Sequence, residues 1–261
     1  MSAIRGLRGF GLRAKTVLTA AAIIFAFVST AQGQAKAATL VGAGNLPGCL
    51  SGALTDPRPY MQKFRATILR VVVSPGNDHG NSGEALPCIS AARAEKYRVM
   101  VVIQWASWWP IKTDQWWFAR ELKLYGHYSS AVGIGNEQEI VPPNTKPAQY
   151  VRVWRAVEPT VKRVAPWALR IGGEISPWGF NDLSQELRLG LPGIQAISVH
   201  PYKFSFGYSV RQALRLAHRY RLPLWCDEGL QEGPDSWPSI ARTIPLRAMQ
   251  GAAMAAVWDR I

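Results

Sequence analysis

Two glutamates, Glu137 and Glu228, each follow an apolar run that ends abruptly in polar residues. Two carboxyl groups that face one another can cleave a glycosidic bond, one protonated to assist the leaving oxygen and one ionised to attack the sugar or to activate water. A separation of about 5 to 5.5 Å implies retention of configuration, and a wider one implies inversion. Glu139 and Asp227 are rivals, because either would face the same region if the strand ends were placed differently.

Other polar side chains lie in or after similar apolar runs. Arg70 stands inside the run 66–73, where a buried guanidinium needs a partner. His200 follows a later run and is expected to contact substrate, with a strand-capping role as the alternative. Glu174 also follows a run, and we expect it to lie on a loop rather than to bind substrate.

Eight runs rich in apolar or β-branched residues alternate with segments of helical pattern. Near-continuous apolar runs are typical of strands that are covered on both faces, as in a parallel sheet. Strands are expected at residues 38–44, 66–73, 98–104, 131–135, 168–173, 194–199, 222–227 and 252–258. Helices are expected at 56–64, 82–97, 113–125, 147–164, 181–189 and 209–220, with Pro87 disturbing the second of them.

This alternation predicts an α/β fold, a compact (β/α)8 TIM barrel formed by residues 38–261 as a single domain. Functional groups of such a barrel gather at the carboxyl ends of its strands. A doubly wound open sheet is the second choice, but residues 42–48 depart from G-x-G-x-x-G at the third glycine, and Pro47 disfavours the helix that should follow. No eighth helix is obvious in the pattern, so we expect the barrel to lack a full eighth helix.

The first 37 residues predict a signal peptide for export. Arg5, Arg8, Arg13 and Lys15 precede an apolar run at 17–28, which small residues follow. Cleavage is expected after Ala37 or, alternatively, near Gly33, and an uncleaved anchor is the minority interpretation. The mature protein is therefore expected to be secreted, extracellular or periplasmic, without stable insertion in a membrane.

The net charge of +13 does not predict a nucleic-acid partner. Five of these positive charges lie in the first 37 residues, which contain no acid, so +8 remains for the rest. The remaining charges are scattered over expected helices, as at 211–221, and indicate solvated helix faces rather than a phosphate-binding stripe.

Three cysteines are too few for a disulfide scaffold. Cys49 and Cys88 could pair in an oxidising compartment, whereas Cys226 is expected to be a buried core thiol. The four histidines show no metal-ligand spacing, and no G-x-S-x-G elbow is present. No metal and no cofactor are expected, and we expect a monomer.

The chain has 11 tryptophans, which is many for its length. Aromatic faces can stack on sugar rings, so we expect tryptophans in loops at the barrel mouth to form a platform, namely Trp105, Trp108, Trp109 and Trp178. Trp116 and Trp117 fall within a helix and are expected to pack against the barrel.

Asn136-Glu137 at the end of the fourth strand, with Glu228 at the end of the seventh, resembles the pattern of the clan A glycoside hydrolases, which are retaining enzymes built on this barrel. The resemblance spans strands two to eight. It implies that Glu137 is the acid/base, that Asn136 contacts the sugar 2-hydroxyl and that Glu228 is the nucleophile.

Further matches resemble family 5 of this clan. Arg70 occupies the place of an arginine that holds the nucleophile, His200 and Tyr202 match an H-x-Y motif after strand six, and Trp258 resembles the tryptophan that floors the sugar subsite. Gln138 departs from the proline common after the acid/base, and strand three ends in Gln104 where many relatives have a histidine. The segment 135–137 and Tyr202 are also similar to family 17 β-1,3-glucanases, but residues 229–230 lack their Gly-Trp-Pro.

The expected function is therefore that of a secreted retaining glycosidase that acts on an oligo- or polysaccharide with β-linkages. The charge of Glu228 would raise the pKa of Glu137, while Arg70 and the Tyr202 hydroxyl would favour the ionised form of Glu228. The alternatives are a non-catalytic carbohydrate-binding protein on a degenerate barrel and, third, a basic nucleic-acid binder.

Overall fold

The computed structural model describes residues 42–44, 46, 49, 52–63, 66–75, 83–106, 108–140, 144–200 and 206–226. The chain divides into the units Met1–Ala38 and Thr39–Ile261, and all of the described residues belong to the second. The expected signal peptide, the strand 252–258 and the residues Tyr202, Asp227, Glu228 and Trp258 lie outside the described residues.

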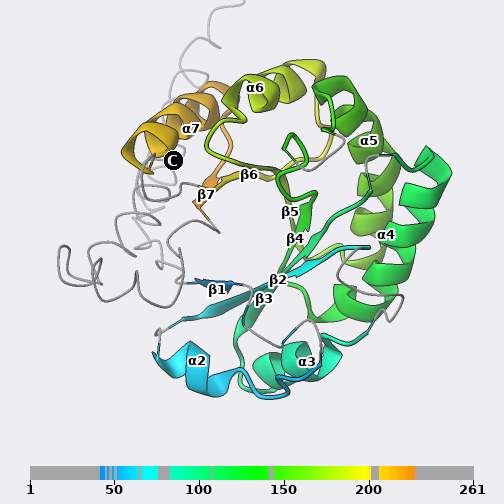
Figure 1. Ribbon diagram of the computed structural model, residues 1–261, viewed down its shortest axis with the longest axis vertical. Coiled ribbons are helices and arrows are strands. Elements are labelled where there is room, and N and C mark those ends of the chain that lie inside the picture. The colour runs from blue at the N-terminus through cyan, green and yellow to red at the C-terminus, as the bar shows by residue number, and fades with distance from the viewer. Residues whose placement is uncertain are drawn as a thin grey trace, which may run out of the picture. The chain divides into compact units, whose positions relative to one another are not determined.

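Seven parallel strands form one sheet, in which each strand pairs with its neighbours in sequence. Figure 1 shows them as an arc. A doubly wound sheet would reverse its strand order at a switch point, and this sheet does not. The strands are β1 (Gly42–Gly44), β2 (Ile68–Val73), β3 (Arg98–Ile103), β4 (Ala131–Ile134), β5 (Leu169–Ile175), β6 (Ala196–Val199) and β7 (Leu224–Cys226).

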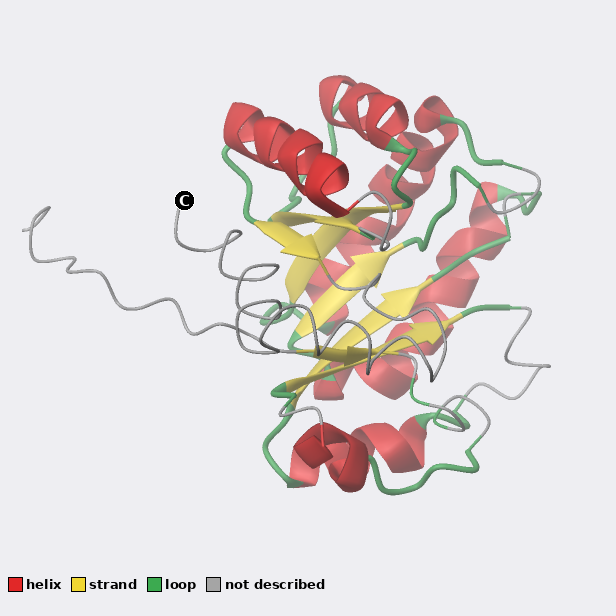
Figure 2. Cartoon of the chain, turned by 60° about the vertical axis from the view of Figure 1, so that its left-hand side comes forward, coloured by secondary structure: helices red, strands yellow, loops and turns green. Residues whose placement is uncertain are grey.

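Helices alternate with the strands and lie around the outside of the arc (Figure 1). Figure 2 shows the same strands fanned side by side, with helices above, behind and below them in this view. The helices are α2 (Arg58–Lys63), α3 (Leu86–Ala94), α4 (Ile111–Tyr125), α5 (Pro147–Val164), α6 (Phe180–Leu189) and α7 (Phe206–Tyr220), with a short 3-10 turn, η1, at Gly126–Tyr128. The alternation and the continuous parallel strand order confirm the predicted fold class as a partial (β/α)8 barrel, and the expected eighth strand lies outside the described residues.

The period of two along a strand separates two hydrophobic layers. On β2, Leu69, Val71 and Val73 join the large core between the sheet and the helices. Ile68 and Val72 point to the opposite, inner face and join a smaller cluster there. That cluster contains Met100, Val102, Ala131, Ile171, Ala196 and Trp225. Arg70 lies between Ile68 and Val72 on the strand and therefore shares the inner face.

Helix α3 is shorter than the segment 82–97 that its pattern predicted. Proline fits the first turn of a helix because the amide hydrogen it lacks would have no helical partner there. Pro87 accordingly lies in the first turn of Leu86–Ala94 rather than in the interior. Helix α5, by contrast, covers the predicted residues 147–164 without a shift.

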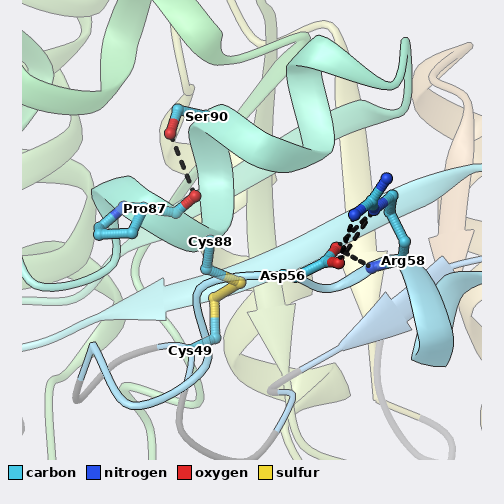
Figure 3. The surroundings of a disulfide bond; sticks show 6 residues. All are labelled: Cys49, Asp56, Arg58, Pro87, Cys88 and Ser90. Atoms are coloured by element: carbon cyan, nitrogen blue, oxygen red, sulfur yellow. Dashed lines mark hydrogen bonds and ion pairs between the residues drawn. A yellow bond between two sulfur atoms is a disulfide. The ribbon is translucent and has the colours of Figure 1, made fainter.

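Cys49 and Cys88, a possible pair on the sequence alone, form a disulfide with a Cα–Cα distance of 5.6 Å. Figure 3 shows Cys88 on α3 and Cys49 in the segment before α2, with the exposed ion pair between Asp56 and Arg58 nearby. The bond therefore fixes this segment to the outer helical layer. Cys226 ends β7, but its side chain lies outside what the structure describes.

Within the described residues, no helix has both the length and the apolar character needed to cross a bilayer.

Candidate active site

Polar side chains follow the inner hydrophobic cluster at the carboxyl ends of the strands. Arg70 comes from β2, Glu174 from β5, and His200 directly follows β6. Their exposed fractions are 2%, 0% and 0%. Charged groups are almost never this deeply buried unless they are paired, so their contacts determine what the site can do.

Five residues form what we call the polar cluster: Arg70, Asn136, Glu137, Glu174 and His200. Nη2 of Arg70 donates to Oδ1 of Asn136 at 2.7 Å and to Oε2 of Glu174 at 3.2 Å. The His200 ring has a carboxylate at each nitrogen, with Glu137 Oε1 3.0 Å from Nδ1 and Glu174 Oε2 3.3 Å from Nε2. Arg70 Nη2 also lies 3.4 Å from His200 Nε2. The cluster thus joins residues of β2 and β5 to residues that follow β4 and β6.

Both glutamates of the cluster adopt the left-handed backbone region, which non-glycine residues rarely enter. Their φ angles are 46° at Glu137 and 48° at Glu174, and nearby glycines have φ of 87° at Gly135 and 89° at Gly173. Such conformations cost of order 1–3 kcal/mol each and occur preferentially at functional sites. The backbone therefore bends at the two points where these carboxyl groups enter the barrel.

Trp105 lies in the core beneath the β4 turn, with an exposed fraction of 2%. A Cβ atom on Gly135 would come within 2.8 Å of its ring, so glycine is required for this contact. The ring also packs against Phe118 and Tyr150. The expectation that Trp105 forms part of an open sugar platform is therefore wrong, because its face is covered by protein; the residue instead supports the turn that carries Asn136 and Glu137.

Asn136 is held from three sides. Its carbonyl oxygen accepts hydrogen bonds from the side-chain amides of Gln104 at 3.2 Å and Gln138 at 3.4 Å. Its side chain accepts from Arg70. The two glutamines that depart from the family 5 pattern thus fix the backbone of this residue.

Tyr150 of α5 connects the two glutamate turns, and nothing in the sequence pattern singled it out. Its hydroxyl donates to the carbonyl of Ile134 at 2.7 Å and accepts from the amide of Gly173 at 3.1 Å. Burial raises the pKa of Tyr150 well above its usual value, so the hydroxyl keeps its proton. A helix residue is thereby tied to the backbone just before each turn.

Glu174 differs most from its expected place on a loop. It lies within β5, fully buried, because the strand continues through Gly172 and Gly173 to Ile175. The register shifts between Gly173 and Ile175, as at a β-bulge. A bulge changes which face a side chain points to, and here the Glu174 side chain joins the cluster. The Gly-Gly pair before a carboxylate is the sequence signal that could have indicated it.

Glu139, the rival of Glu137, contacts the residues that follow β5. Its Oε1 accepts a hydrogen bond from the backbone amide of Ser176 at 2.6 Å. Burial raises the pKa of Glu139 above its usual value, although the contact with Ser176 partly offsets this effect. Of the two glutamates, it is Glu137 whose carboxylate reaches His200.

Two of the predicted platform tryptophans are open to solvent. Trp108 after β3 is 67% exposed and Trp178 after β5 is 76% exposed. Trp109 instead packs against Trp117. Trp116 and Trp117 of α4 were both expected to pack against the barrel. This expectation is confirmed for Trp117, which is buried, and is wrong for Trp116, which is 59% exposed. Trp108 and Trp178 are thus the described indoles available for stacking in loops that follow strands.

Strand β7 ends at Cys226, two residues before Glu228 in the sequence. No group of three or more histidine, cysteine, aspartate or glutamate side chains that could hold a metal ion occurs among the described residues.

No protein-family model matches the chain, and no curated protein matches it. Among solved structures it is similar to a glucosidase from Croceicoccus marinus, with a TM-score of 0.58 and 12% identity over 75% of this chain and 52% of that one. It is also similar to N2152 from Neocallimastix frontalis, with a TM-score of 0.52 and 15% identity over 81% and 58%. The GH53 catalytic domain of Ignisphaera aggregans gives 0.51 and 17% over 69% and 63%.

The chain spans between 52% and 63% of the length of these three proteins. Identities this low show the fold alone. The chain therefore has a barrel architecture that is also found in a glucosidase and in a GH53 catalytic domain.

Proposed function

We propose that this chain is an exported, retaining glycoside hydrolase of the clan A type, which acts on a β-linked glycan. The observation that carries the proposal is the position of Glu137: it follows Asn136 at the carboxyl end of β4, and His200 and Arg70 contact this pair. The barrel shared with a glucosidase supports the same class of substrate. Glu228 is proposed as the second carboxylate, and the sequence 1–37 as the export signal.

The proposed chemistry is a double displacement. Glu137 donates its proton to the glycosidic oxygen while a Glu228 carboxylate oxygen attacks the anomeric carbon, which gives a covalent glycosyl ester and a free alcohol. Glu137, now ionised, then removes a proton from water as that water displaces Glu228 from the sugar. Asn136, which Arg70 orients through its amide oxygen, is left with amide hydrogens that can contact a sugar hydroxyl.

The exposed indoles of Trp108 and Trp178 suit sugar binding because a flat aromatic face stacks on the apolar face of a pyranose. The same two residues also suit a carbohydrate-binding protein without catalysis, which is the second candidate function. The two candidates differ in whether Glu137 is needed for turnover.

The test is hydrolysis of a panel of aryl β-glycosides by the protein and by the variants Glu137→Ala and Glu228→Ala. Each variant is expected to lose about 10²–10⁴-fold in kcat/KM, since general acid–base catalysis contributes a factor of this size and a lost nucleophile at least as much. Glu139→Gln is the matched control, because this acid lies two residues away and binds Ser176; it should retain activity.

A 2-deoxy-2-fluoro glycoside that traps the intermediate should label Glu228 in the intact protein. Labelling of another residue, or an inverted product, would contradict the proposal. Sugar binding without hydrolysis of any substrate in the panel would favour the non-catalytic candidate.

A further inference from the structure

The structure assigns a further role to Glu174: it is a positioning residue that acts through His200 on the protonation of Glu137. This inference rests on the proposed function, since it concerns how the proposed acid/base is controlled. Glu174 was not expected to take part in the site, and it does not need to touch a substrate to fill this role.

The side chain of Glu174 is connected to that of Glu137 through the ring of His200. Its Oε2 lies 3.3 Å from His200 Nε2, and Nδ1 on the other side of the ring lies 3.0 Å from Glu137 Oε1. Arg70 Nη2 binds the same Oε2 at 3.2 Å. Glu174 and His200 are both fully buried, so water screens these charges little.

The backbone of Glu174 makes a second connection. Its carbonyl oxygen accepts a hydrogen bond from the amide of Glu137 at 2.7 Å. The space for its carboxylate depends on Gly133, where an added Cβ would lie 2.5 Å from Oε1 of Glu174. Glu174 thus holds Glu137 in two ways, directly through its main-chain carbonyl and indirectly through its side chain and His200.

The identity of the neighbours at Nε2 determines the histidine tautomer. Arginine can only donate hydrogen bonds, whereas an ionised carboxylate can only accept them. A proton on Nε2 therefore has Glu174 as its acceptor, and the negative charge of Glu174 favours that proton. Nδ1 of the neutral ring then carries a lone pair, so a proton on Glu137 is shared between its Oε1 and Nδ1.

The charge of Glu174 sets how tightly that shared proton is held. A carboxylate close to an ionisable pair favours the protonated form of the pair. Arg70 opposes this effect, and the described groups that face His200 are Arg70, Glu137 and Glu174. Glu174 thus keeps the acid form of Glu137 present to higher pH, which is the form that must assist departure of the leaving group.

The test compares Glu174→Gln with the unmodified protein on phenyl and 2,4-dinitrophenyl β-glycosides across pH. The basic limb of kcat/KM for the phenyl glycoside should move to lower pH by about one unit. Activity above the limb should fall about tenfold for the phenyl substrate and change little for the dinitrophenyl substrate, which departs without a proton. Glu174→Asp retains the negative charge, so the basic limb of its kcat/KM profile should return to the position found for the unmodified protein.

Glu158→Gln is the matched control. Glu158 forms an ion pair with Arg170 at 3.0 Å, so this change also removes a partly buried carboxylate paired with an arginine of β5. We expect it to lower stability without moving the pH profile. An equal loss on both substrates in Glu174→Gln, with an unmoved limb, would overturn the inference and leave only a structural role.

A measurement on the unmodified protein does not depend on folding of a variant. Nitrogen-15 NMR of labelled histidine should show Nε2 of His200 protonated throughout the pH range in which the protein is folded. A neutral ring with its proton on Nδ1 alone would overturn the inference. Because this readout needs no turnover, an inactive protein that shows the expected tautomer would contradict the proposed function and not the role of Glu174.

Discussion

Buried acids lie in two regions of this barrel, the polar cluster and the helical layer, and the side chains that surround them differ. In the polar cluster, the buried Glu174 carboxylate contacts both Arg70 and His200. In the helical layer, Asp114 of α4 and Glu186 of α6 are also buried, but among the described residues neither forms an ion pair with a basic side chain.

The protonation of these two acids reflects the difference. Burial raises the pKa of Asp114 to about 7, and Arg152 only partly opposes this shift. Burial also raises the pKa of Glu186 well above its usual value, with the charges of Glu139 and Asp182 adding to the effect. Glu174 is thus buried against two basic side chains, whereas Asp114 and Glu186 are buried without one in contact, which favours their protonated forms.

The largest effect is expected from Arg70→Met, which leaves the buried Glu174 carboxylate without its guanidinium. Loss of one partner of a buried ion pair costs about 3–5 kcal/mol. Urea unfolding should show this loss. The double variant with Glu174→Gln should lose less than the sum of the two single changes, since it also removes the stranded charge. Additive losses would show that the cluster is not a coupled unit.

A smaller effect of opposite sign is expected from Glu186→Leu, at a position between the buried Leu183 and Leu187. Because the folded-state pKa of Glu186 is raised, folding becomes less favourable as pH rises above the unfolded-state pKa. The variant should gain about 2 kcal/mol at neutral pH and progressively less toward acid pH. Urea midpoints measured at several pH values check this trend, and a loss of stability at neutral pH would refute the assignment of Glu186 as an uncompensated acid.

The smallest effect is expected from Asp114→Asn, because the new amide remains buried. The folded-state pKa of about 7 lies above the usual 3.8, so ionisation of Asp114 in the unfolded chain destabilises the fold progressively between these two values. The variant should remove this pH dependence and gain about 1 kcal/mol near neutral pH. Thermal unfolding at acid and neutral pH measures it, and identical pH slopes in both proteins would contradict it.

Local pattern was sufficient for most of the fold. Runs of β-branched residues such as 68–73 predicted buried parallel strands, and the spacing of apolar residues in Pro147–Val164 predicted both ends of α5. Arg70, His200 and the Asn136-Glu137 pair were correctly expected near one another, because parallel strands bring their carboxyl ends to one edge.

The remaining features depend on contacts between distant segments. Glu174 lies in β5 rather than on the expected loop because Gly172 gives room to the Trp154 ring and Gly173 allows the register shift. Trp105 was expected at the mouth because it follows a strand, but its ring turns inward beneath Gly135. Neither of these contacts between a tryptophan ring and a glycine leaves a periodic signal in the sequence.

The left-handed backbone at Glu137 places folding stability and the proposed catalytic activity in conflict at this position. Glycine enters this region without cost and asparagine enters it more readily than glutamate, so either residue would relax a bend that is strained with glutamate. A library sorted for heat resistance alone would consequently enrich replacements at the very position where the proposed chemistry needs a carboxyl group. Directed evolution of this chain therefore requires selection for turnover at every round.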